Sequence, residues 1–67
     1  MDKALQEAAR RAGGVRALAR MLGINHQSII RWLRTPAVRV LEIERLTGVP
    51  RYQLRPDLYP PVDYRKR

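Results

Sequence analysis

The sequence predicts an all-α fold, a small bundle of four to five short helices in one domain. Apolar residues recur at three- and four-residue spacing in successive segments, which is the pattern of helices with one buried face. Glycine or proline closes each of these segments, as expected where a helix ends. With 67 residues the chain is long enough for a single small core.

Two helices are predicted in the first third of the chain, over residues 2–12 and 15–22. Asp2 can cap the first helix, and a pair of glycines ends it. Arg16 and Arg20 share the outer face of the second helix, and Gly23 supplies the left-handed backbone of a sharp helix end. The two apolar stripes consist of Leu5, Ala8, Ala9 and Ala12, and of Val15, Leu18, Ala19 and Leu22.

A third helix is predicted over residues 25–34, after a turn of only two or three residues. Asn25 can cap its first turn. The helix is expected to stop before Thr35-Pro36, because a residue that precedes proline avoids the helical region. Three apolar residues at helical spacing are expected to face the core: Ile29, Trp32 and Leu33.

The second and third predicted helices together form a helix-turn-helix motif. Ala19 is expected where the two helices cross, because a larger side chain would push them apart. Gly23 follows in the turn, and Ile24 and Ile29 supply inward-facing anchors. A small residue, a turn glycine and β-branched anchors at this spacing are more specific together than any one of them alone.

A fourth helix is predicted over residues 37–47 and ends at Gly48. Its apolar residues surround most of the helix, so it lies centrally in the core or packs a second face on a partner. They are Val38, Val40, Leu41, Ile43 and Leu46. One further turn is expected at residues 51–54, and the tyrosine-bearing segment 52–59 is expected to fold back on the core. Residues 60–67 are expected to be a flexible basic tail, which leaves 1–59 as the helix-turn-helix domain.

Charge indicates the class of partner. Fourteen Lys and Arg residues oppose six Asp and Glu, which gives a net charge of +8. No acid occurs from Ala8 to Leu41, a stretch that contains seven arginines. Arginine presents a flat, bidentate fork that suits phosphates and guanine edges. This segregation favours a polyanion, and double-stranded DNA in particular, over a merely solvated basic surface.

The outer face of the third helix carries groups suited to reading DNA. Gln can pair with adenine, Arg with guanine, and an exposed Ile can meet a thymine methyl group. The predicted base-reading residues are His26, Gln27, Ser28, Ile30, Arg31 and Arg34. The predicted phosphate contacts are Arg16, Arg20, Asn25, Thr35 and Arg39, although Asn25 can also serve only as a cap.

Two stretches of the chain, GGVRALARMLGINHQSIIRWLR and LEIERLTGVPRYQLRPDLYP, resemble the YdaS-like regulators, Cro-type proteins of prophages and related plasmids. The resemblance covers about residues 4–60, and the string Leu54–Tyr59 is its most distinctive part. It implies a lambda repressor/Cro-like helical fold and a transcription regulator, often a repressor of a divergent promoter. It also implies base reading by Gln27, Ser28 and Arg31, while Asn25-His26 departs from the Ser/Thr-Pro often found in this family.

The expected function is therefore sequence-specific binding of double-stranded DNA in the bacterial cytoplasm. One such helix covers few base pairs, so we expect a homodimer, formed in solution or only on DNA. One histidine, no cysteine and no clustered carboxylates argue against an enzyme, a metal site or a cofactor. The main alternative is an antitoxin or antirepressor that acts through a protein partner. RNA binding is disfavoured by the few aromatics, and a membrane-surface peptide by the several tight turns.

Overall fold

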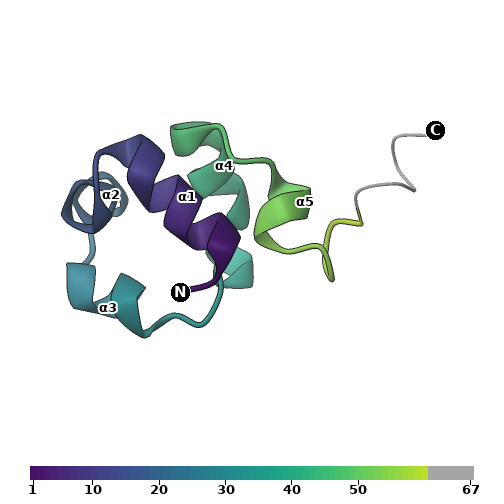
Figure 1. The fold of residues 1–67 in the computed structure, drawn as a ribbon, viewed down its shortest axis with the longest axis horizontal. Helices are drawn as coiled ribbons and strands as arrows, with labels where there is room; N and C mark the ends of the chain where they lie inside the picture. Colours follow the sequence, from purple (N-terminus) through teal and green to yellow (C-terminus); the bar gives the residue numbers. More distant parts are fainter. Residues whose placement is uncertain (61–67) are drawn as a thin grey trace.

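Five α-helices and one short 3-10 helix follow one another along residues 1–60, the part of the chain that the computed structural model describes (Figure 1). They are α1 (Lys3–Ala12), α2 (Val15–Leu22), α3 (His26–Arg31), η1 (Ala37–Arg39), α4 (Val40–Thr47) and α5 (Arg51–Leu54). This range contains no strand, so the predicted all-α class is confirmed. No helix within it combines the length and the apolar character that crossing a membrane requires.

Helix α1 lies across the middle of the molecule and packs against α2, α4 and α5. Helix α2 packs against α3 at one end of the molecule, and α5 lies at the other end (Figure 1). Side chains from every α-helix meet in one core: Leu5, Ala8, Ala9, Leu18, Ala19, Leu22, Ile29, Val40, Ile43, Val49 and Leu54. Because the apolar stripe of α1 packs against α2, it holds α2 in place, and α2 in turn holds α3.

Local capping explains why the first helices begin and end where they do. The Asp2 side chain accepts a hydrogen bond from the Leu5 backbone N–H at 3.0 Å, which satisfies one of the free amides at the start of α1. Gly13 and Gly23 end α1 and α2 with φ values of 104° and 72°, a region that L side chains rarely adopt. The predicted range of the second helix, 15–22, is confirmed.

The third helix is shorter than predicted. It ends at Arg31, not at residue 34, because Trp32 adopts an extended backbone with ψ of 126°. The residues after Trp32 therefore no longer follow helical spacing. The pattern predicted that Leu33 would be buried, but Thr35 is buried instead. Thr35 is fully buried, whereas the side chain of Leu33 is 85% exposed. Trp32 packs partly against the core, as predicted.

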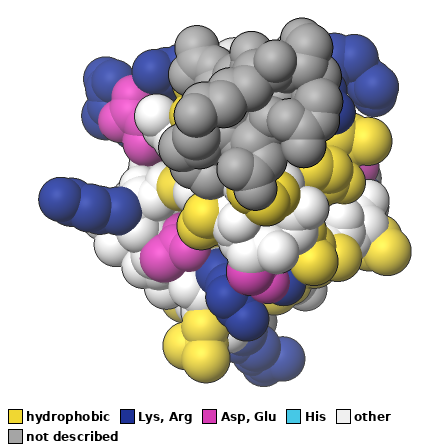
Figure 2. Space-filling model, turned by 90° about the vertical axis from the view of Figure 1, so that its right-hand side faces the viewer, with side chains coloured by type: hydrophobic (Ala, Val, Ile, Leu, Met, Phe, Trp, Pro, Cys, Tyr) yellow, Lys and Arg dark blue, Asp and Glu magenta, His cyan; other side chains and the backbone are white. Residues whose placement is uncertain are grey.

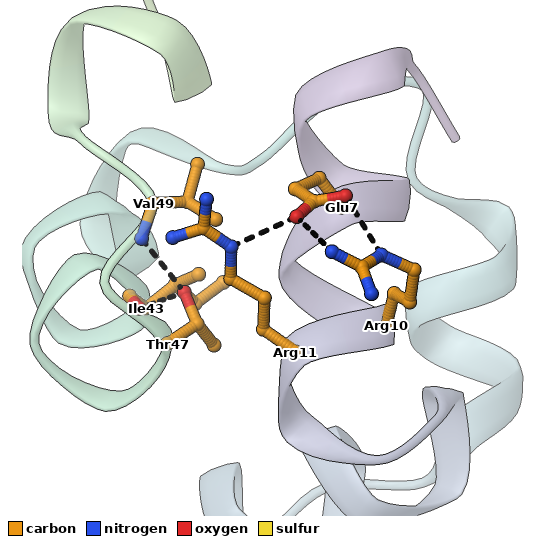
Figure 3. Close-up of polar contacts among 6 residues, drawn as sticks. All are labelled: Glu7, Arg10, Arg11, Ile43, Thr47 and Val49. Carbon is orange, nitrogen blue, oxygen red and sulfur yellow. Dashed lines mark hydrogen bonds and ion pairs between the residues drawn. The ribbon is translucent and has the colours of Figure 1, made fainter.

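The fourth predicted helix is divided between η1 and α4. Val40 and Ile43 of α4 are fully buried, but Val38 is 89% exposed and Leu41 and Leu46 are also exposed. The Thr47 hydroxyl group donates to the Ile43 carbonyl at 2.7 Å and accepts from the Val49 N–H at 3.3 Å, so it closes the end of α4 (Figure 3). The apolar surplus of this segment is thus exposed and does not enter the core.

The segment after α4 folds back on the core. α5 occupies the predicted turn, Leu54 is fully buried, and Tyr59 packs against the core. Leu58 was expected to join them but is exposed. The predicted flexible tail lies, apart from Pro60, outside the described residues.

Candidate nucleic-acid interface

Residues 23–25 form the short turn that joins α2 to α3, the two helices of the predicted helix-turn-helix. The Gly23 N–H donates to the Arg20 carbonyl at 3.3 Å, and the Ile24 N–H donates to the Ala19 carbonyl at 3.0 Å. Ala19 is buried, and Ile24 packs against the core beyond the turn. These contacts fix where α3 leaves α2, so the small residue and the turn glycine have the places that the sequence predicted.

A side-chain cap fixes the first turn of α3. The Asn25 side chain accepts from the Gln27 N–H at 2.8 Å, which confirms the predicted capping role. Ile29 is fully buried and anchors the inner face of the helix. The outer face of this six-residue helix is therefore set by a cap that directly precedes it and by one buried anchor within it.

The predicted base-reading residues do not all share that outer face. Gln27, Ile30 and Arg31 are exposed on α3, while His26 and Ser28 are partly buried. Arg34 is exposed but lies beyond the end of the helix, so it is not part of the outer face of α3 on which it was predicted. Its Nη1 atom lies 3.8 Å from Oδ1 of Asp57.

The predicted phosphate contacts differ more widely in their exposure and in their ion pairing. Arg16 and Arg20 are exposed on α2. Arg39 donates to Glu42 at 3.0 Å and is largely covered. Thr35 does not fit the predicted role, because its side chain is fully buried and cannot reach a phosphate. Its hydroxyl group has no hydrogen-bond partner among the described residues.

Every acidic residue in the range 1–60 is engaged within the fold. Asp2 caps α1, and the other four acids form ion pairs with arginines. The pairs are Glu7 with Arg10 (2.6 Å) and Arg11 (2.8 Å), Glu42 with Arg39 (3.0 Å), Glu44 with Arg51 (2.9 Å), and Asp57 with Arg55 (2.8 Å) and Arg34 (3.8 Å). None of these ion pairs includes a residue of α2 or α3, which contain no acid.

The cations of the helix-turn-helix are left without such partners. Within residues 1–60, Arg16, Arg20 and Arg31 form no ion pair, and outside α2 and α3 this holds only for Lys3 and Arg45. Figure 2 views the molecule from the α5 end, where acidic side chains lie beside basic ones. Three of the five cations without an ion pair in residues 1–60 therefore lie on the two helices of the motif.

Two carboxyl groups have strongly shifted pKa values. Hydrogen bonds from Arg10 and then Arg11 lower the pKa of Glu7 to about 2 (Figure 3). A hydrogen bond from Arg55 lowers the pKa of Asp57 to about 2. Both groups are thus ionised at neutral pH, and each balances the charge of one of the two arginines that it contacts. No group of three or more His, Cys, Asp or Glu side chains in the described part of the chain is placed to hold a metal ion.

A family model described as bacterial toxin YdaS matches residues 5–63. The chain belongs to the YdaS family. The resemblance drawn from the sequence is thereby confirmed, over nearly the same range. No curated protein and no solved structure gives a match to the chain.

Sequence reasoning missed the contacts that join the C-terminal part of this YdaS-family protein to the loop after α3 and to α4. Arg55 donates to the Thr35 carbonyl at 3.0 Å across 20 residues, and Glu44 accepts from both the backbone and the side chain of Arg51. The family resemblance was the only sequence signal for these contacts, because the matching stretches include Glu44 and the string Leu54–Tyr59.

Proposed function

We propose that this YdaS-family protein is a sequence-specific, double-stranded DNA-binding transcription regulator, a Cro-like repressor that reads the major groove with α3. One observation carries the proposal. Arg16, Arg20 and Arg31 are exposed without carboxylate partners within residues 1–60, while most other arginines of that range are paired. Free cations on the two helices of the motif are the groups that a DNA backbone neutralises.

Base reading would come from the exposed face of α3. Gln27 can hold adenine through two hydrogen bonds, and Arg31 can hold guanine in the same way. Ile30, which is 55% exposed, can pack against a thymine methyl group. His26 and Ser28 lie at the N-terminal end of α3, the end that enters the groove in this class of motif.

Phosphate contacts would fix the register of α3 on the duplex. Arg16 and Arg20 are four residues apart on α2, so both extend from the same helix face toward one strand of the backbone. Arg39 contributes less in this proposal than the sequence suggested, because Glu42 already neutralises it. Such contacts supply affinity without sequence information.

A homodimer on an inverted repeat would give the length of DNA that a six-residue α3 cannot cover alone. The exposed apolar side chains of η1 and α4 are the surface we assign to it: Val38, Leu41 and Leu46. The tyrosine-bearing segment is a weaker choice, because Tyr59 is packed on the protein's own core. The function needs no cofactor or catalytic group, and we place it in the bacterial cytoplasm.

The second candidate is an antitoxin or antirepressor that binds a protein partner. It is favoured by Leu33, in the loop after α3, and by Val38, in η1, which are 85% and 89% exposed. Such side chains would be covered in a complex. This candidate predicts that a partner, not DNA, protects the loop.

The location of the interface can be tested by NMR titration of the protein with a duplex of about two helical turns. The proposal predicts that amide resonances of residues 14–31 shift, while those of α5 do not. The matched variants Arg16→Ala and Arg45→Ala each remove one unpaired cation, but only the first should weaken the shifts. Shifts centred on α1 and α5 would contradict the proposal.

A further inference from the structure

The loop that follows α3, residues 32–36, is tied to the C-terminal segment by one arginine. Nη1 of Arg55 donates to the Thr35 carbonyl at 3.0 Å. The other side of the same guanidinium faces Asp57, with Nε to Oδ1 at 2.9 Å and Nη2 to Oδ2 at 2.8 Å. Because a guanidinium is planar, the two bonds to Asp57 fix the direction in which Nη1 points.

The base of this arginine is itself held in place. Leu54, directly before it, is fully buried. The Arg55 carbonyl accepts from the backbone N–H groups of Leu58 at 3.1 Å and Tyr59 at 2.9 Å, which closes a turn around Asp57. The Arg51 guanidinium lies 5.7 Å from the centre of the Tyr59 ring, which packs on the core. The side chain of Arg55 is only 13% exposed, so it works inside the fold and not as a surface charge.

The loop needs such a support. Trp32 leaves the helical conformation, and residues 32–36 belong to no helix. In Figure 1 the loop runs from α3 at one end of the molecule toward η1 below α1. Thr35 is buried at its far end, but its hydroxyl group has no hydrogen-bond partner among residues 1–60. The carbonyl of Thr35 is thus the polar group through which the Arg55 side chain holds the loop.

Asp57 connects the same segment to the DNA-facing side. Its carboxylate lies 3.8 Å from Nη1 of Arg34, which is exposed at the end of the motif. The pKa of Asp57 is lowered to about 2 by Arg55, so the carboxylate stays charged at neutral pH. One acid therefore contacts two arginines: Arg55, which holds the loop, through two hydrogen bonds, and the exposed Arg34 through a longer ion pair.

We propose that Arg55, oriented by Asp57, is a positioning residue that sets where α3 ends and how Arg31 and Arg34 are presented to DNA. The inference rests on the proposed function, since it concerns the same DNA interface. We call the contacts of Arg55 with Asp57 and with the Thr35 carbonyl the clamp. The Leu54–Tyr59 string carries Arg55 and Asp57, the apolar anchor Leu54 before them and the turn that follows, so the proposal gives this string a purpose.

The test is Arg55→Lys, with Arg45→Lys as the matched control at an exposed, unpaired position. Lysine keeps the charge but cannot reproduce the flat fork, so Arg55→Lys should lower the ratio of operator to non-specific affinity by about tenfold, the loss of one base contact. The operator is the duplex that the wild-type protein enriches from random DNA. Measurements are made well below both melting temperatures, and Arg45→Lys should leave the ratio unchanged.

A purely structural role for Arg55 would lower the melting temperature but leave the ratio unchanged, and that result would overturn the proposal. If Arg55→Lys does not fold, Asp57→Asn is used with the same readout and the same expected direction. Hydrogen exchange at the amides of residues 32–35 is followed in the free proteins as well, and the clamp requires faster exchange in the variants. If the wild-type protein has no preferred sequence, the proposed function fails, and unchanged exchange would separately refute the clamp.

Discussion

Replacing Arg20 by Ala should reduce the salt dependence of DNA binding, whereas replacing Arg10 by Ala should leave it nearly unchanged. Both variants lose one positive charge from an exposed side chain. They differ because Arg20 has no carboxylate partner within residues 1–60, while Arg10 is paired with Glu7 at 2.6 Å. After Arg10→Ala, Glu7 still holds Arg11, and α2 and α3 keep their three unpaired arginines.

The size of the effect follows from counterion release. Each phosphate that a protein neutralises contributes about −0.9 to the slope of log K against log salt concentration. Arg16 and Arg20 from two subunits would give four contacts and a slope of about −3.6, or roughly a 150-fold loss of affinity between about 50 and 200 mM salt. Removing Arg20 should make the slope less steep by about 1.8, to about −1.8, if two subunits bind. The change should be only about 0.9 if the protein binds as a monomer.

The assay is fluorescence anisotropy of a labelled duplex titrated at several KCl concentrations. A slope reduced for Arg20→Ala but not for Arg10→Ala supports the division between paired and unpaired arginines, and its size counts the subunits. Equal reductions would mean that the ion pairs do not matter. No reduction in either variant would remove Arg20 from the interface.

Four further outcomes are expected. Arg31→Ala should cost about 1–3 kcal/mol on the selected duplex and relax preference at one base pair in a competition assay; equal losses on specific and non-specific DNA would make Arg31 a phosphate contact instead. Ala19→Leu should destabilise the fold by about 1–3 kcal/mol through overpacking, which lowers the calorimetric melting temperature by about 8 °C per kcal/mol for a domain of this size; an unchanged temperature would contradict close packing at this position. Thr35→Val should leave urea unfolding unchanged or shift it to higher urea, because the hydroxyl group is buried without a partner in the described range; a loss above about 1 kcal/mol would refute this. Glu7 and Asp57 have pKa values lowered from 4.5 and 3.8 to about 2, so the stability they contribute is present above those ordinary values and is lost as pH falls toward 2; melting curves from pH 6 to 2 should show this decline, and Glu7→Gln should make it shallower.

Those parts of the fold that depend on neighbouring residues could be predicted from the sequence. Asp2, Asn25 and Gly23 cap or end helices through bonds within a few residues, so their roles follow from local chemistry. The end of α3 could not be predicted in this way. The spacing of Ile29, Trp32 and Leu33 is helical, but the chain leaves the helix at Trp32 and Thr35 enters the core.

The candidate interface was predictable to a similar degree. Periodicity placed Gln27, Ile30 and Arg31 on an exposed face, because α3 is regular over those positions. It could not indicate which arginines are neutralised, since pairs such as Glu44 with Arg51 and Asp57 with Arg34 join residues from different elements. Nor could it indicate the bond from Arg55 to Thr35, which spans 20 residues.

The positions that carry the family resemblance have a physical reading as well. Glu44 accepts two hydrogen bonds from Arg51 at the start of α5, and Thr47 closes α4 through its hydroxyl group. Gly48 adopts a φ of 80° at the end of the same helix. These residues hold turns and helix ends, so the positions that carry the resemblance belong to the scaffold of the fold.

Selection of bound duplexes from random DNA at near-physiological salt tests the central claim most directly. The account predicts an enriched inverted repeat with half-sites about one helical turn apart. It also predicts that the protein with Gln27→Ala enriches a sequence changed within each half-site. Binding without any enriched sequence would explain the basic surface but contradict base reading by α3, and would favour a protein partner for this YdaS-family protein.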